Sequence, residues 1–444
     1  MKRLAIIGVL LTLLPAALAP AAERFALPEF KSGYVRPETD TPPPRAGVLD
    51  YVDVAVLAAA LVLASYLALK VRSRRWLWVL MAGSLVYFGL WRGGCVCPIG
   101  AIQNVALGLL GTGYAVPLAV IAFFLLPLVT ALVAGRTFCA AVCPLGAIQD
   151  LVAVWPLRVP RWIDHALGLL AYVYLGAAVL FAATGAMFII CEYDPFVSFF
   201  RLLPLARPAA AMEVFGGSTG MLILGLGFLA AGLVIARPYC RWLCPYGAVL
   251  RVLSRASKWH VAITPDECVQ CTLCRDSCPF NAIQTPTTGE PRSDRLIDRR
   301  RLALLLVLVP LLLAGGGWFG ARLGGPFSKA HYTVQQAERV RMEETGEVED
   351  TVDMSEAFYA TRRSRADLYA EAEAVRHRFV WGGVLLGVWV GLVVAVKLVH
   401  LSIRRTRTDY TPDRATCLSC GRCFEYCPVE RERLKKSKGA PAET

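Results

Sequence analysis

Charged side chains are scarce in this sequence: Asp, Glu, Lys and Arg make up 18% of its 444 residues, whereas hydrophobic residues make up 56%. This composition excludes an ordinary soluble enzyme and indicates a polytopic membrane protein. The net charge of +13 would suggest nucleic-acid binding in a soluble chain. Here, however, the arginines flank apolar segments, as they do on the cytoplasmic side of membrane proteins. We therefore exclude nucleic acid as a partner and expect membrane lipid instead.

Histidine is also scarce, with five in the chain, which leaves little for haem ligation. His165 and His400 lie near the ends of apolar segments, where they could face one another across a haem or a quinone. Single histidines in such places are more often interfacial polar groups. The sequence shows no acidic or histidine-lined pocket, and we assign no redox role to these two residues.

Long apolar runs are abundant. Met1-Lys2-Arg3, followed by apolar residues to Ala19, is typical of a secretory signal peptide or a membrane anchor. Later stretches have about the 20 residues that are needed to cross a bilayer. These predicted spans run over 50–71, 76–93, 114–134, 165–188, 219–236, 302–320 and 379–400.

Arginines set the expected orientation of these spans. If the polar segment 23–48 is periplasmic, counting spans places a series of arginine-containing segments in the cytoplasm. This is the positive-inside bias of membrane proteins. We therefore expect a multi-pass protein of the bacterial inner (plasma) membrane. The arginine-containing segments are 72–75, 158–161, 237–255, 299–301 and 404–405.

Cysteine is plentiful, with 15 in the chain. Eight of these cysteines form two copies of the motif Cys-x-x-Cys-x-x-Cys-x-x-x-Cys-Pro, separated by the last two spans. In two-cluster ferredoxins, three closely spaced cysteines hold one 4Fe-4S cluster, and the cysteine before proline holds the other. We therefore expect two 4Fe-4S clusters. One would be held by Cys268, Cys271, Cys274 and Cys427, and the other by Cys417, Cys420, Cys423 and Cys278.

Zinc and disulfides are the alternatives for these eight cysteines. Zinc sites favour Cys-x-x-Cys pairs separated by a longer loop, rather than a triplet with a trailing Cys-Pro. Disulfides are rare in the cytoplasm, and both motifs fall there because an even number of spans separates them. The two halves of the cluster-binding unit must therefore meet in space.

Together these features predict an α-helical polytopic membrane protein, with about seven transmembrane helices after a signal segment and a small cytoplasmic split ferredoxin-like module. We expect a signal peptide or anchor over 1–22, a periplasmic segment over 23–48, a five-span membrane domain with Cys-Pro repeats over 49–259, the first ferredoxin half over 260–298, a sixth span over 299–320, a periplasmic helical loop over 321–378, a seventh span over 379–402, and the second ferredoxin half with a basic tail over 403–444.

A shorter repeat, Cys-Pro-x-Gly-Ala, occurs three times and begins at Cys97, Cys143 and Cys244. Repetition of one unit implies one structural element used several times. Proline suits the first position of a helix, so each of these cysteines is predicted to cap a helix at its positive end. Such a position stabilises a thiolate and hence metal binding.

Two copies of the repeat carry another cysteine four residues earlier and fall at the cytoplasmic edge. With Arg136, Arg237 and Arg241 around them, their four cysteines would hold a further iron–sulfur cluster or one metal ion. The alternatives are two separate redox-active thiol pairs, or small apolar residues that let helices approach closely. The four cysteines are Cys139, Cys143, Cys240 and Cys244.

The three remaining cysteines, Cys95, Cys97 and Cys191, fall at the opposite, periplasmic edge by the same count of spans. They could share an outer metal centre, with Glu192, Asp194, a water or a partner's group as its fourth ligand. An oxidising periplasm could instead join Cys191 to Cys95 or Cys97 in a disulfide. Both outcomes are compatible with the sequence.

In these motifs the chain resembles the NosR/NapH/MauN group of membrane polyferredoxins, over about residues 76–280. Segments 139–147 and 240–248 match the paired membrane motifs of that group, and 268–279 matches its cytoplasmic ferredoxin. The resemblance implies electron delivery to periplasmic redox enzymes or to their maturation.

The chain departs from this group in two ways. NosR-type chains carry a periplasmic flavin domain, whereas this chain has only 23–48 and no Ser/Thr-Gly-Ala-Thr flavin attachment motif. Their ferredoxin motifs also lie close together rather than split.

We therefore expect a transmembrane electron-transfer protein that serves as a subunit of an oxidoreductase system rather than as a stand-alone enzyme. Its partners would be a periplasmic flavin protein or metalloprotein and a cytoplasmic electron donor or quinone. Two competing interpretations are a membrane reductase of quinone or of a metal ion such as copper, and a redox-sensing maturation factor for a periplasmic metalloenzyme.

Overall fold

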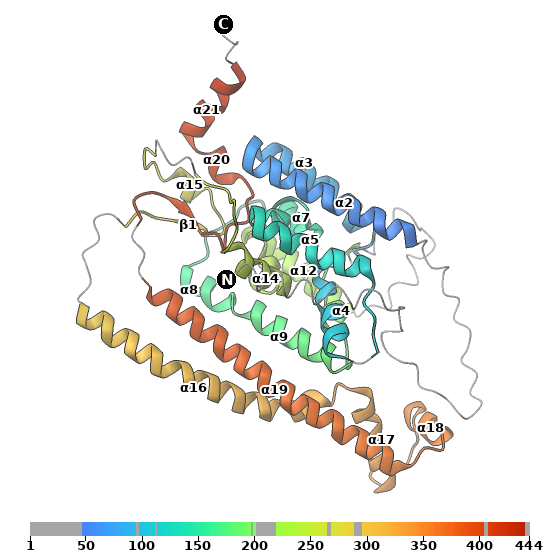
Figure 1. Ribbon diagram of the computed structural model, residues 1–444. Coiled ribbons are helices and arrows are strands. Elements are labelled where there is room, and N and C mark those ends of the chain that lie inside the picture. The colour runs from blue at the N-terminus through green and yellow to red at the C-terminus, as the bar shows by residue number, and fades with distance from the viewer. Residues whose placement is uncertain are drawn as a thin grey trace.

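The structure is a computed structural model, and it describes residues 47–94, 97–111, 113–196, 199–200, 219–263, 268–287, 295–403 and 407–439 (Figure 1). The predicted signal segment 1–22, nearly all of the segment 23–48 and Cys95 lie outside the described residues.

The described chain is almost entirely helical. The first part contains α2 (Gly47–Tyr66), η2 (Leu67–Val71), α3 (Arg74–Ser84), η3 (Leu85–Trp91), α4 (Pro98–Leu110), α5 (Leu118–Ala134), α6 (Thr137–Ala141), α7 (Pro144–Val152), α8 (Arg161–Leu167), α9 (Leu170–Ala183), α10 (Ile189–Glu192), α12 (Thr219–Val234), α13 (Pro238–Trp242) and α14 (Pro245–Ser254).

The second part holds two short strands, two long helices and several short helices. These are α15 (Leu273–Asp276), β1 (Ile283–Gln284), α16 (Arg295–Ser328), α17 (Tyr332–Glu344), α18 (Asp353–Ala360), α19 (Arg365–Ser402), β2 (Thr411–Pro412), α20 (Arg422–Glu425) and α21 (Pro428–Gly439).

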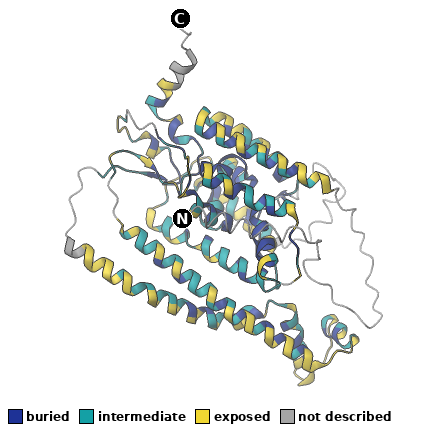
Figure 2. Cartoon of the chain, in the orientation of Figure 1, coloured by how far each residue is buried: buried dark blue, intermediate teal, exposed yellow. Residues whose placement is uncertain are grey.

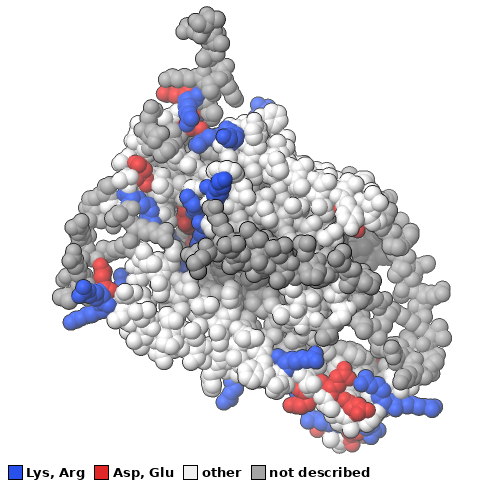
Figure 3. Space-filling view, in the orientation of Figure 1, with Lys and Arg blue, Asp and Glu red and all other residues white. Residues whose placement is uncertain are grey.

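Each predicted span falls on a helical segment. Among the described residues, four segments are long and apolar enough to cross a membrane, while α4, α5 and α12 are shorter apolar helices. A broad uncharged zone separates charged residues near α17 and α18 from those at the opposite end of the molecule (Figure 3). These features show a membrane protein. The four long segments are Gly47–Val71, Arg161–Ala183, Asp298–Ser328 and Arg365–Ser402.

Helix α4 was not among the predicted spans. It has 13 residues and extends about 20 Å at 1.5 Å per residue, less than the ~30 Å hydrocarbon core. Its first ten residues are nearly all buried against the other helices (Figure 2). A short buried helix of this kind begins inside the protein, and it carries Cys97 at its start.

Helices α16 and α19 run side by side as a long hairpin (Figure 1). Glycines allow this close approach: a Cβ atom added at Gly387 would overlap the carbonyl of Gly316, and one added at Gly320 would overlap the carbonyl of Gly383. Small residues at four-residue spacing pack membrane helices in this way. The hairpin ends in α17 and α18, which confirms the predicted helical character of the loop between the last two spans.

The two ferredoxin halves meet, as the split motif requires. Strand β1 pairs antiparallel with β2, with Ile283 opposite Pro412 and Gln284 opposite Thr411. The backbone N–H of Asp413 also donates to the carbonyl of Ala282, at 2.7 Å. The two halves, which α16 and α19 separate in the sequence, thus form one small module at the end of the molecule that contains α15 and α20 (Figure 1).

Candidate iron–sulfur sites

The first predicted set of ferredoxin cysteines surrounds one pocket. Cys268, Cys271 and Cys274 line it together with Cys427, which comes from the other end of the chain. The rest of the lining is mainly apolar, with Ile263, Val269, Tyr410 and Val429 among its residues. The structure thus brings together the four residues that the crossed arrangement of two-cluster ferredoxins predicts for one cluster.

The second set is also gathered. Cys417 and Cys423 lie close enough to Cys420 and Cys278 for their charges to interact. Burial raises the pKa of the Cys417 thiol to about 12, and burial raises the pKa of Cys278 as well. Without metal these thiols stay protonated at neutral pH. Iron binding must therefore displace their protons.

The spacing of these cysteines along the sequence is typical of 4Fe-4S motifs rather than of single-zinc sites. Among the described residues, no group of three or more His, Cys, Asp or Glu side chains is placed to hold one metal ion. A tetrahedral zinc would need sulfurs about 3.8 Å apart, because each lies about 2.3 Å from the ion. A 4Fe-4S cube spreads its thiolates further apart, because each binds a different iron. When bound, such a cluster would supply one-electron transfer.

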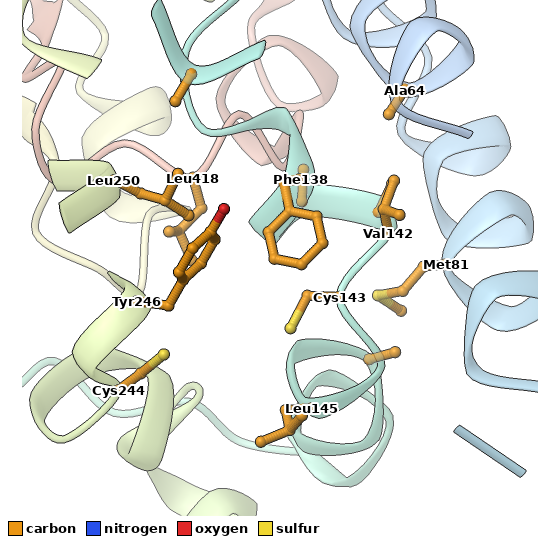
Figure 4. Close-up of a cluster of buried hydrophobic side chains, with 14 of the residues drawn as sticks. Ala64, Met81, Phe138, Val142, Cys143, Leu145, Cys244, Tyr246, Leu250 and Leu418 are labelled. Carbon is orange, nitrogen blue, oxygen red and sulfur yellow. The ribbon is translucent and has the colours of Figure 1, made fainter. Parts of the chain in front are cut away.

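The Cys-Pro repeats form helix starts, as predicted. Cys97, Cys143 and Cys244 are the N-cap residues of α4, α7 and α14, each followed by proline in the first turn. At Cys244 the sulfur itself caps the helix, because it accepts a hydrogen bond from the backbone N–H of Gly247. The sulfurs of Cys143 and Cys244 point into the space between these helix starts, beside Tyr246 (Figure 4). The prediction of cysteine caps is therefore confirmed.

The repeats of Cys143 and Cys244, which the sequence analysis places at the inner, cytoplasmic edge, are called the inner repeats. The arginine that precedes each of them contacts the other. Arg136, which precedes the first repeat, donates to the sulfur of Cys139 and approaches Gly247 of the second, where an added Cβ would lie 3.5 Å from its guanidinium. Arg237, which precedes the second repeat, donates to the carbonyl of Cys139 and approaches Gly146 of the first, at 3.0 Å from an added Cβ. The glycine of each repeat therefore leaves room for the other repeat's arginine.

The four inner cysteines form one group. Cys143 lies within electrostatic range of Cys139, Cys240 and Cys244, and Cys240 lies within range of Cys139. Cys143 and Cys244 are buried, while Cys139 and Cys240 are partly exposed. The structure thus brings together the four residues predicted to share an inner centre.

Arg241 does not face these sulfurs, in contrast to the predicted bracketing. It pairs with Asp164, with nitrogen–oxygen distances of 2.6 and 2.8 Å, and donates to the carbonyl of Pro279 at 2.8 Å. Pro279 directly follows Cys278 of the ferredoxin module. Arg241 therefore attaches the module to the membrane helices.

Two buried glutamines that the sequence analysis did not single out hold cysteines in place. Gln149 accepts from the backbone N–H of Tyr239 at 3.1 Å and donates to the sulfur of Cys240 at 3.2 Å. Gln103 accepts from the backbone N–H of Ile190 at 2.6 Å and donates to the sulfur of Cys191 at 3.6 Å. A signal was present, because both glutamines follow the cysteine of a Cys-Pro-x-Gly-Ala-Ile repeat by six residues.

The predicted outer cysteines lie next to the inner group. Cys97 is within electrostatic range of Cys191 and Asp194, and Cys244 is within range of Cys97. The ring of Phe196 packs edge-on against Tyr239, the neighbour of Cys240, with centroids 5.4 Å apart. Of the two acids proposed as a fourth ligand, Asp194 is buried and Glu192 is exposed. The two cysteine groups are thus not separated by a full bilayer.

Comparison with known proteins adds to this geometry. Residues 116–162 and 218–263 match a 4Fe-4S binding domain family, and 261–284 match a second 4Fe-4S binding domain family. The ferredoxin-type protein NapH of Escherichia coli is 32% identical over 213 residues, which cover 46% of this chain and 67% of NapH. The chain belongs to the NosR/NapH/MauN family of membrane polyferredoxins.

Other members of the membrane polyferredoxin family match less of their length. The methylamine utilization ferredoxin-type protein MauN of Paracoccus denitrificans is 31% identical over 177 residues, 38% of this chain and 56% of MauN. YccM of Escherichia coli is 27% identical over 195 residues, 41% of this chain, and the match spans about half of YccM, 52%. No solved structure matches the chain. Iron–sulfur binding and electron transport are properties of this family.

Proposed function

We propose that this polyferredoxin passes electrons across the bacterial inner membrane, between two cytoplasmic 4Fe-4S clusters and a periplasmic redox partner. The clusters are those assigned above to the two crossed sets of ferredoxin cysteines. A third centre, held by Cys139, Cys143, Cys240 and Cys244, would receive electrons from them or deliver electrons to them. The partner, a flavin protein or metalloprotein, would carry out the chemistry.

The observation that carries this proposal is the contact between the ferredoxin module and the inner cysteine group. Arg136 donates to the sulfur of Cys139 and to the carbonyl of Ala415, two residues before Cys417. Arg237 lies within electrostatic range of both Cys240 and Cys420. Two buried arginines thus lie between two groups of cysteines. Their positive charge would offset the negative charge of the bound clusters. The arrangement supports electron transfer between adjacent centres.

Counting metal tests the inner centre. Each 4Fe-4S cluster contributes about four irons and four labile sulfides, so anaerobically purified protein should contain at least about twelve of each, and Cys244→Ala about four fewer. Electron paramagnetic resonance of the reduced variant should still show both ferredoxin clusters. A wild-type content of only about eight irons, unchanged in Cys244→Ala, would show that the inner cysteines hold no cluster.

One cavity favours a second function, the oxidation of a quinol or reduction of a quinone. A cavity of about 580 Å³ lies between α8, α14, α19 and the ferredoxin module, and its lining includes Cys240, His165 and His400. Arg136 and Arg251 also line it, so guanidinium groups and imidazoles share its wall. A quinone carbonyl could accept from such groups, beside the inner cysteines. The sequence analysis considered His165 and His400 facing one another across a quinone but assigned them no redox role, and the structure places both in the wall of this one cavity.

Filling the cavity tests this second function. Val393 of α19 lines the cavity, and its apolar side chain forms no hydrogen bond to the cysteine groups. Val393→Trp should therefore fill the space that a quinone ring would need. A quinol analogue, which would release two electrons and two protons, should reduce the clusters of the wild type but not of the variant. Dithionite should reduce both proteins equally. Equal reduction of both by the quinol analogue would rule out the cavity as the site.

A further inference from the structure

Two parts of the membrane domain are built on the same plan. In the inner part, Cys143 caps α7, and Gln149 on that helix holds Cys240, which lies on the short helix α13. In the outer part, Cys97 caps α4, and Gln103 on that helix holds Cys191, which lies on the short helix α10.

The correspondence extends to individual atoms. In both parts the glutamine Oε1 accepts from the backbone N–H of the residue just before the held cysteine, Tyr239 or Ile190. In both parts the glutamine Nε2 donates to that cysteine's sulfur. Both glutamine side chains are fully buried, at 0% exposure. A buried amide that donates to a sulfur is typical of the surroundings of a metal-bound thiolate.

Asp194 completes the outer copy. In the inner part the second cysteine, Cys244, directly precedes a proline, and its sulfur accepts from a backbone N–H of the following turn. In the outer part Asp194 directly precedes Pro195, and its Oδ1 accepts from the backbone N–H of Phe196 at 2.9 Å. Asp194 is buried, and it interacts electrostatically with Cys97. A carboxylate thus occupies the position that a cysteine has in the inner copy.

We infer that Cys97, Cys191 and Asp194 hold a second membrane iron–sulfur cluster, and that Gln103 and Gln149 are the positioning residues of the outer and inner centres. Two thiolates and one carboxylate would bind three irons of a cube and leave the fourth iron for a further ligand. This inference rests on the proposed function, because it takes the inner cysteines as a cluster site. It also assigns Cys191 to metal rather than to a disulfide.

The position of this cluster gives it a role in crossing the membrane. Tyr174 lies within electrostatic range of Asp194, Cys191 and Cys244, so it stands between the outer and inner groups. A hydrocarbon core of about 30 Å is a wide gap for electron transfer. A second cluster beside the inner one divides the crossing into shorter steps and brings electrons toward the periplasmic side.

Single alanine variants test the site. Cys191→Ala should contain about four fewer irons than the wild type, as should Cys143→Ala, whereas Glu192→Gln, a change at the exposed neighbour of Cys191, should lose none. Mass mapping of the purified protein should find Cys191 in no disulfide. If Cys143→Ala loses iron and Cys191→Ala does not, the outer cluster is wrong and the proposed function stands. If neither loses iron, the inner centre is wrong as well.

Glutamine variants test the positioning role by a readout that does not depend on catalysis. Hydrogen bonds to cluster sulfurs raise the reduction potential, so Gln103→Leu should make one paramagnetic resonance signal titrate at a more negative potential, and Gln149→Leu should shift a different signal. Gln103→Glu keeps the acceptor for Ile190 but loses the donor to sulfur, and it should shift the same signal as Gln103→Leu. Unchanged reduction potentials in all three variants would show that both glutamines only hold the backbone in place and do not tune a cluster.

Discussion

Cys427→Ala will lose about four irons per chain, although Cys427 lies in the second ferredoxin motif and the other ligands of the lost cluster lie in the first. The structure is the reason, because Cys427 lines the pocket of Cys268, Cys271 and Cys274. Iron and labile sulfide, measured on anaerobically purified protein, give the result directly.

Double variants identify which cluster has been lost. Adding Cys268→Ala to Cys427→Ala should remove no further iron, because both residues bind the same cluster. Adding Cys417→Ala should remove about four more. Cys278→Ala is the mirror control, and its loss should be additive with that of Cys268→Ala. The opposite pattern, with Cys427 and Cys417 behaving as partners, would show that each motif binds its own cluster.

Asp164→Ala will destabilise the protein far more than a typical surface change. Arg241 is only 4% exposed, and Asp164 is its partner through two hydrogen bonds and a third from Trp242 at 2.9 Å. Removing one member of a buried ion pair leaves the other charge uncompensated, at a cost of about 3 kcal/mol or more. The loss should appear as a lower midpoint of thermal unfolding in detergent. The ferredoxin module should also become easier to cleave with protease, because Arg241 also holds Pro279.

A matched control is available on the surface. Arg158 and Asp276 form an ion pair of 2.8 Å between the membrane domain and the same module, but their side chains are 44% and 48% exposed. Exposed pairs contribute little because water and salt screen them. Arg158→Ala should therefore leave the midpoint nearly unchanged. Equal losses in the two variants would show that burial of the Arg241 pair is not what stabilises the docking.

Much of this arrangement could be predicted from the sequence because its signals are local. A cysteine followed by proline predicted the helix caps at Cys97, Cys143 and Cys244, and all three are confirmed. Apolar runs predicted the helical segments. The membrane count and sidedness stay predictions, since length and composition alone describe the four long helices.

Other features depend on contacts between distant parts of the chain. Gln149 looks like an ordinary helix residue until Cys240 is placed beside it, 91 positions later. The cavity beside His165 exists because α19 returns to pack against α9. Helix α4 is too short to register as a span, so the closeness of Cys97 to Cys244 could not be read from the apolar pattern.

Electron transfer across a sealed membrane tests the central claim most directly. The protein, reconstituted in phospholipid vesicles with dithionite trapped inside, should reduce ferricyanide added outside, followed by its absorbance. Cys244→Ala, shown by paramagnetic resonance to retain both ferredoxin clusters, should be no faster than empty vesicles, because the inner centre connects the module to the rest of the path. Ferricyanide reduction by Cys244→Ala at the wild-type rate would contradict the account.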